Sequence, residues 1–160
     1  MISSIRSGGQ SGVDRAALDC ALALGLSYGG WCPAGGGAED YPVPPGLLAE
    51  YPLLVETPSS DPEQRTEWNV RDSDATLILT CGDPTALSPG TRHTAGVAER
   101  SGKPCLLLSA LDDADRRTLA AFVAALGEQP IDLNIAGPRE SQRPGVYVRA
   151  KDFLMDALRP

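Results

Sequence analysis

The chain alternates between segments with helical spacing of apolar residues and short apolar runs. In residues 13–24 the apolar positions lie three or four residues apart, which predicts an amphipathic helix that Gly25 ends. Residues 62–72 follow a helix-start signature in which Ser60 and Glu63 have the spacing of a capping box. Further helices are predicted over residues 91–102, 112–126 and 146–158.

Short apolar segments between the helices predict strands. They are MISSIR, LSYGGW, YPLLVE, ATLILT, KPCLLLS and IDLNIAG, and the fourth and fifth are apolar enough to be buried on both faces. Alternating strands and helices predict an α/β fold with a doubly wound parallel sheet. The chain has no internal repeat and no linker, so residues 1–160 are expected to form a single ligand-binding domain.

The loops that follow the strands are expected to meet at one edge of the sheet. Doubly wound sheets bind ligands outside the carboxyl ends of their strands, so this edge is the expected ligand site. The loops concerned are residues 7–12, 32–46, 57–61, 81–91 and 137–144.

The first of these loops, SGGQSG, is rich in glycine and leads directly into a predicted helix. Glycines allow a ligand to approach the backbone, and the free N–H groups of a helix N-terminus attract anions. We therefore expect the loop to bind a phosphate group, and a bulky side chain at Gly9 to block binding without disturbing the fold. A tight turn without a ligand is the alternative. The residues concerned are Gly8, Gly9, Gln10, Ser11 and Gly12.

Charged residues close to the glycine loops are further candidates for ligand contacts. Asp14 can orient a ligand or serve as a solvated helix-capping acid, and Arg15 can contact phosphate or form a surface pair. Arg139, which follows the last predicted strand, can clamp an anion or lie on a surface loop. Asn134 in that strand is expected to be a buried, hydrogen-bonded residue.

A second helix start is predicted at the same edge. Gly90 closes a turn, Thr91 is the expected N-cap, and Thr94 lies one turn into the helix with a hydroxyl available to a ligand. Two helix N-termini directed at one cleft indicate an anion site more specifically than one. His93 is expected to be solvated, because no Ser or Cys is spaced to form a triad with it.

The charge and the cysteine pattern exclude several kinds of partner. A formal net charge of −7 repels phosphate backbones, so nucleic acid is not an expected partner. No signal-peptide pattern and no membrane-spanning apolar run occur, and the 4 cysteines include no C-x-x-C pair. We therefore expect a reduced cytoplasmic protein without a membrane partner. With 1 histidine, no metal site is expected, and Cys81 is interpreted as a structural thiol, with an approach to a metal carried by the ligand as the alternative.

The helix predicted over residues 62–72 carries few apolar residues. Trp68 is its large apolar side chain, and Arg65 and Asp72 lie on a polar face. We expect this helix to join two subunits, with Arg65 and Asp72 paired across a twofold axis in a homodimer or larger even oligomer. Packing of Trp68 on the sheet of its own chain is the alternative.

Several motifs in their order along the chain resemble the bacterial molybdenum carrier family. They are SGGQSGVDRAALDCALALGLSYGGWCP, AEDYPVP, YPLLVETPSSDPEQRTEWNVRDSDATLIL, PGTRHTAGVAERSGKP and NIAGPRES with the following PGVY. The family is similar to a larger Rossmann-like group that includes molybdenum-cofactor carriers and the lysine-decarboxylase-like phosphoribohydrolases. The resemblance implies a three-layer α/β/α sheet, a ligand at the glycine loops and an oligomer.

The resemblance suggests molybdenum cofactor (molybdopterin) as the ligand, with Trp31 as a stacking surface. The phosphoribohydrolases carry a Glu in their P-G-G-x-G-T-x-x-E motif, and Thr94 stands at that position here. Because Thr has no carboxylate, a non-catalytic carrier is favoured over cleavage of a nucleoside monophosphate. A phosphoribohydrolase-like enzyme and a nucleotide-sensing module remain the alternative hypotheses.

Overall fold

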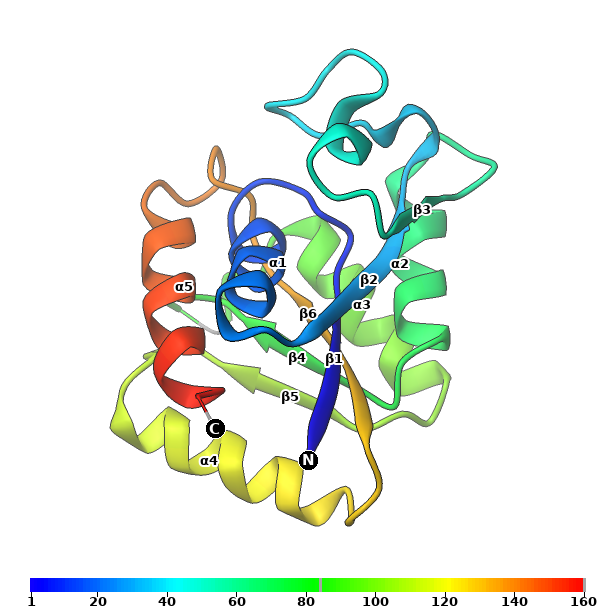
Figure 1. Ribbon diagram of the computed structural model, residues 1–160. Coiled ribbons are helices and arrows are strands. Elements are labelled where there is room, and N and C mark those ends of the chain that lie inside the picture. The colour runs from blue at the N-terminus through cyan, green and yellow to red at the C-terminus, as the bar shows by residue number, and fades with distance from the viewer. Residues whose placement is uncertain (84, 160) are drawn as a thin grey trace.

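The computed structural model describes residues 1–83 and 85–159, and over these residues it contains one six-stranded sheet and five α-helices (Figure 1). All strand pairs are parallel, in the order β3-β2-β1-β6-β4-β5. The strands are β1 (Ile2–Arg6), β2 (Ser27–Cys32), β3 (Leu54–Glu56), β4 (Ala75–Leu79), β5 (Cys105–Leu108) and β6 (Ile131–Ala136). The helices are α1 (Val13–Leu24), α2 (Pro62–Arg71), α3 (Pro89–Arg100), α4 (Asp113–Ala125) and α5 (Val146–Ala157).

The helices form layers on both faces of the sheet, so the predicted doubly wound, three-layer α/β/α fold is confirmed. Helix α1 packs against α5, which also contacts α4, on one face, and α2 packs against α3 on the other (Figure 1). Crossovers between parallel strands are right-handed, so strand steps in opposite directions put their helices on opposite faces. The apolar stripe of α1 is fully buried from Val13 to Ala21 and partly buried at Leu24, as its spacing predicts.

The last strand, β6, lies in the middle of the sheet, between β1 and β4. Helices α1 and α3 follow β1 and β4 on opposite faces, so the loops at the ends of β1, β6 and β4 diverge around one point of the carboxyl edge. This is the crossover position where doubly wound sheets bind ligands. Asn134 of β6 is 2 % exposed and donates from Nδ2 to Oγ1 of Thr76 on β4 at 3.2 Å, which confirms the predicted buried hydrogen bond.

Two helix starts and one strand differ from the predictions. Asp61, rather than Ser60, caps α2, and Ser88, rather than Thr91, caps α3. The physical reason is the same in both, because proline occupies the first helical position and the N-cap is therefore the residue before it. The fifth strand is at the edge of the sheet, so Cys105 is exposed and the strand is not buried on both faces.

In the part of the chain that the structure describes, no helix is long and apolar enough to cross a lipid bilayer.

Candidate functional site

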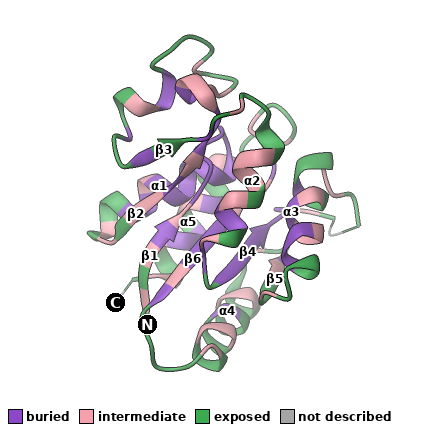
Figure 2. Ribbon diagram, turned by 90° about the vertical axis from the view of Figure 1, so that its right-hand side faces the viewer, coloured by how far each residue is buried: buried purple, intermediate pink, exposed green. Residues whose placement is uncertain are grey.

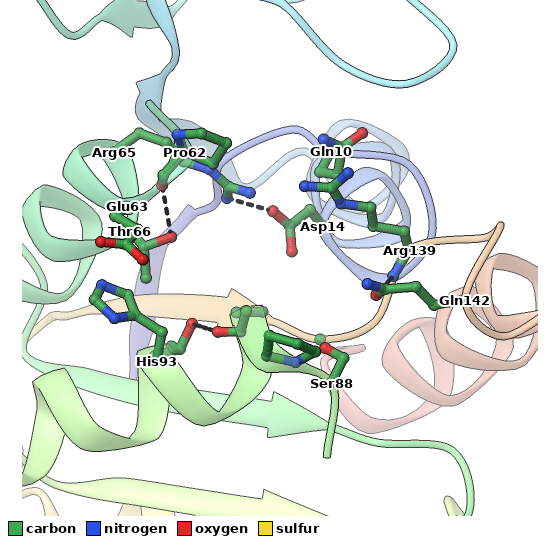
Figure 3. A pocket seen from close by; sticks show the side chains of 15 residues that line it. Gln10, Asp14, Pro62, Glu63, Arg65, Thr66, Ser88, His93, Arg139 and Gln142 are labelled. Carbon is green, nitrogen blue, oxygen red and sulfur yellow. Dashed lines mark hydrogen bonds and ion pairs between the residues drawn. The ribbon is translucent and has the colours of Figure 1, made fainter. Parts of the chain in front are cut away.

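A polar cleft with a cavity of about 150 Å³ lies at the carboxyl edge of the sheet, at the crossover around β6 (Figure 3). Its walls come from the starts of α1 and α3, the first two turns of α2 and the loop after β6. The lining residues are Gln10, Asp14, Pro62, Glu63, Arg65, Thr66, Ser88, Pro89, Gly90, His93, Thr94, Ala136, Gly137, Arg139 and Gln142. Of the predicted site residues, the structure brings Gln10, Asp14, Gly90, Thr94 and Arg139 together here.

An ion pair between Arg65 and Asp14 forms one wall of this cleft. Nη1 of Arg65 donates to Oδ2 of Asp14 at 2.8 Å, and the two side chains are only 12 % and 4 % exposed (Figure 3). The guanidinium lies directly against Gly8, where a Cβ atom would overlap Nη1. Glycine at position 8 therefore makes room for the guanidinium of Arg65. The sequence had predicted that it makes room for a ligand.

The carboxylate of Asp14 depends on this pairing. Burial raises the pKa of Asp14 above 3.8, although the charge and hydrogen bond of Arg65 and hydrogen bonds with the backbone of Gln10 and Gly137 act against the rise. A buried carboxylate without a charged partner strongly destabilises the folded state, so an ionised Asp14 requires the pairing with Arg65. Asp14 is thus a buried partner of Arg65, and the alternative of a solvated capping acid is wrong.

Two buried nitrogen atoms in the cleft walls have no hydrogen-bond partner. They are Nε of Arg65 and Nε2 of His93, which are the only such side-chain N or O atoms in the described residues. Nε2 of His93 lies 3.8 Å from Oε1 of Glu67, which is beyond hydrogen-bond distance. His93 is thus mostly buried and not solvated as predicted. The Nε–H of Arg65 is a donor, and Nε2 of His93 can donate or accept, so both are polar atoms whose pairing with a ligand would be favourable.

The start of α3 contributes backbone groups to the opposite wall. Ser88 caps the helix by accepting from the backbone N–H of Thr91 at 3.2 Å, and the hydroxyl of Thr94 donates to the Gly90 carbonyl at 3.0 Å. A Cβ at Gly90 would meet no atom within 4 Å, so the helix start is open at this point. Thr91 itself faces a neighbouring hollow with Thr80 and Arg143.

A carboxylate of the chain itself binds the opening glycine loop through the hydroxyl of Ser11. The hydroxyl of Ser11 donates to Oε1 of Glu39, which also accepts from the backbone N–H of Ser141 at 3.2 Å. Oε1 of Gln10 accepts from the backbone N–H groups of Ser11 at 3.1 Å and of Glu39 at 2.8 Å. Partial burial raises the pKa of Glu39, but the hydrogen bonds from Ser11 and Ser141 outweigh it and the pKa is lowered. Of the two side chains predicted to bind a ligand anion here, Ser11 thus holds an internal carboxylate and Gln10 accepts from the backbone.

The other glycines of this loop are explained by packing. Gly9 has φ of +71°, and a Cβ there would lie 2.9 Å from Leu47 Cδ1, so a larger residue would disturb the fold. The left-handed backbone and this contact argue against the expectation that a bulky residue at Gly9 leaves the fold intact. Gly12 has φ of +80°, and a Cβ there would lie 2.8 Å from the backbone nitrogen of Glu140, in the loop that packs against the start of α1.

Arg15 and Trp31 lie outside the cleft. Nη1 of Arg15 donates to Asp40 at 3.0 Å, and its Nη2 donates to the carbonyl of Gly9 at 3.1 Å, so Arg15 ties residue 40 to the opening loop. Nε1 of Trp31 donates to Oδ2 of Asp72 at 2.7 Å, on the sheet face that α2 borders. Both side chains already have partners within the chain and face other hollows.

Cys81 also lies outside the cleft lining. Burial raises the pKa of its thiol to about 11, against the nearby charges of Arg149 and Arg143. Both arginines donate to its carbonyl, at 3.0 and 2.9 Å. In the described residues, no group of three or more His, Cys, Asp or Glu side chains is placed to hold a metal ion.

Sequence reasoning missed Arg65, Gln142 and Glu63 as cleft residues. The sequence pattern predicts Arg65 at a subunit interface, because it shares a helix face with Asp72. The available signal was its position: α2 follows β3, so its first turns must begin at the same carboxyl edge as the glycine loops. The N-terminal face of α2 was therefore a candidate wall of the site.

The fold and the cleft define a Rossmann-like α/β protein with a polar cleft at the strand crossover. The chain belongs to the circularly permutated YpsA SLOG family, whose model matches residues 5–158. The crystal structure of the "Putative molybdenum carrier protein" from Syntrophus aciditrophicus SB is similar, with a TM-score of 0.86 and 41 % identity over 98 % of this chain and 95 % of that one. No curated protein matches the chain significantly.

Proposed function

We propose that this protein is a carrier that binds a phosphate-bearing heteroaromatic ligand in the cleft, with molybdenum cofactor as the candidate. The observation that carries the proposal is Arg65, a guanidinium 12 % exposed in the cleft wall whose Nε is buried without a partner. Arginine binds phosphate through parallel N–H groups, and Asp14 takes only a donor of Nη1, so the guanidinium keeps donor capacity for a ligand phosphate at the cleft wall. The name of the similar Syntrophus protein supports a molybdenum-related ligand.

The size of the cavity limits how the cofactor fits. About 150 Å³ is smaller than the roughly 300–1,000 Å³ typical of sites for drug-sized ligands, so the cavity fits a phosphate group while a pterin would lie along the rim. Arg65 and Arg139 would supply charge, and Gln10 and Gln142 would supply amide groups at the rim. The cofactor would bring its own metal, and these residues would bind and orient the cofactor. The phosphate site that we propose is therefore at Arg65 and not at the opening glycine loop, where the sequence predicts it.

Replacing Arg65 by Lys separates ligand binding from stability. Lys keeps the charge beside Asp14 but loses the planar fork, so we expect a fold that persists and ligand retention reduced by about 10- to 100-fold. The ligand is identified by mass spectrometry of compounds released from wild-type protein purified from its own organism, and retention is measured by the same assay. Arg116→Lys on α4, outside the cleft, is the matched control and should retain ligand fully. A released compound without phosphate, or full retention by Arg65→Lys, contradicts the proposal.

The alternative of a phosphoribohydrolase-like enzyme makes a different prediction. Thr94 has a hydroxyl, bonded to the Gly90 carbonyl, and no carboxylate, and the carboxylate of the buried Asp14 is paired with Arg65, so neither residue can supply the free carboxylate that the phosphoribohydrolase motif uses. We expect incubation with AMP to release no adenine above background, as measured by chromatography. Release at an ordinary enzymatic rate of about 1–10³ s⁻¹ would show that the protein is an enzyme. A nucleotide released in the mass-spectrometric experiment without turnover would indicate a sensing module.

A further inference from the structure

Two glutamine side chains present NH₂ groups to the cleft, because the chain itself takes their amide oxygens. Gln10 is 8 % exposed, and its Oε1 accepts from the backbone N–H groups of Ser11 at 3.1 Å and of Glu39 at 2.8 Å. Oε1 of Gln142 accepts from the backbone N–H of Arg139 at 3.1 Å. Both glutamines line the cavity (Figure 3), so the NH₂ group of each is the part that remains for a ligand.

The charged groups of the cleft walls add further donors. Nε of Arg65 is buried without a partner, and the guanidinium of Arg139 can only donate. Asp14 accepts from Nη1 of Arg65 and has hydrogen bonds with the backbone of Gln10 and Gly137. Its side chain is 4 % exposed, so this carboxylate is not available to take a proton from a ligand.

The other polar side chains do not supply a buried carboxylate. Glu63 belongs to the exposed first turn of α2 (Figure 2), where water solvates it. The hydroxyls of Thr66 and Thr94 donate to helix carbonyls, both at 3.0 Å. Nε2 of His93 can donate or accept. The cleft walls therefore offer oriented donors to a bound anion.

We infer that the cleft selects the doubly ionised form of a phosphate monoester and rejects oxyanions that carry a proton. The inference rests on the proposed function, because it concerns the phosphate end of the same ligand. The terminal oxygens of a monoester dianion all accept hydrogen bonds, which matches the amide and guanidinium donors. An O–H on the anion would face one of these donors and leave it without an acceptor.

Charge alone would not produce this selectivity. The cleft walls carry the guanidinium groups of Arg65 and Arg139 and the carboxylates of Asp14 and Glu63, together with the imidazole of His93. The two cations and the two carboxylates balance, so the positions of the donors decide which anion fits. Hydrogen-bond donors distinguish an oxygen that carries a proton from one that does not.

Calorimetry with three small probe ions tests the selectivity of the full chain. At about pH 7.5, sulfate and methyl phosphate should each bind at least about 10-fold more tightly than inorganic phosphate, which keeps a proton. At about pH 5, methyl phosphate is mostly singly ionised because its second pKa is about 6, so its affinity relative to sulfate should fall by about 10-fold. Sulfate stays doubly ionised, so titration of His93 or Glu63 acts on both probes and cancels in the ratio.

Replacing Gln10 by Glu supplies the missing acceptor. The carboxylate can keep both backbone hydrogen bonds of the amide oxygen, and it places a second oxygen where the NH₂ group stands. The preference for sulfate over inorganic phosphate should therefore fall by about 10-fold or more. Gln142→Glu is the second cleft variant and should act in the same direction, with circular dichroism to establish that each variant is folded.

Gln64→Glu is the matched control for the added charge. Oε1 of Gln64 accepts from the backbone N–H of Ser59 at 2.9 Å, in the same way as the cleft glutamines, but Gln64 does not line the cavity. This variant should keep the wild-type preference for sulfate.

The outcomes separate this inference from the proposed phosphate site. Equal affinities for sulfate and inorganic phosphate, a constant ratio of methyl phosphate to sulfate, or an unchanged preference in folded Gln10→Glu and Gln142→Glu protein would overturn the inference alone. An equal loss of preference in Gln64→Glu would do the same. If none of the three probes binds, both the phosphate site and the inference are wrong. A preference that only the cleft variants reduce supports the inference.

Discussion

Replacing Arg65 by Met is expected to destabilise the protein by about 3–5 kcal/mol, because it leaves the buried carboxylate of Asp14 without its charged partner. Arg65 and Asp14 are 12 % and 4 % exposed, so water cannot take over the role of the guanidinium. Urea denaturation gives the free energy of unfolding. The double variant Arg65→Met with Asp14→Asn should recover at least half of the loss, because it removes the buried charge as well.

The pH dependence of stability provides a second measurement of the same pair. Burial raises the pKa of Asp14 above 3.8, so the folded state binds this proton more tightly than the unfolded chain. The contribution of Asp14 to stability is therefore greatest in acid and is lost as the pH rises through the raised pKa. The difference in unfolding free energy between wild type and Asp14→Asn should show this slope. A double variant no more stable than Arg65→Met alone, together with a flat difference, would rule out a buried charge as the cause.

Replacing Gly30 by Ala is expected to lower the free energy of unfolding by more than about 4 kcal/mol. Losses of this size occur only when a substitution causes severe steric overlap or backbone strain. The residue has φ of +130°, and its Cβ would overlap the carbonyl of Ser7 and lie 2.8 Å from Oδ1 of Asn69. That Asn69 oxygen accepts from the backbone N–H of Trp31 at 2.8 Å, so the clash would also separate α2 from β2.

The control for this variant is Gly37→Ala. Gly37 has φ of −68°, and a Cβ there meets no atom within 4 Å, so we expect a change within about 0.5 kcal/mol. Thermal and urea denaturation of the two variants should therefore differ widely. Equal stabilities would mean that the backbone around Gly30 relaxes and that this strand is not held by its contact with Asn69.

The local sequence by itself determined the elements and the class of fold. Residues 13–24 form α1 with the predicted bounds and with Gly25 in a left-handed conformation, because the spacing of apolar residues and the terminal glycine act within a few positions. The alternation of strands and helices was likewise sufficient to predict a parallel, doubly wound sheet. The helix starts were misplaced by one to three residues, although the proline signals were present in the sequence.

Only the tertiary structure decided which residues form the cleft. Arg65 reaches Asp14 across 51 positions of the chain, and Glu39 binds the hydroxyl of Ser11 from 28 positions away. Both contacts depend on the placement of β6 between β1 and β4 and on the fold of residues 33–51, and neither of these is a local property. A glycine-rich loop before a helix attracts anions on physical grounds, but whether the anion is a ligand or a carboxylate of the same chain depends on which distant segment the fold brings to it.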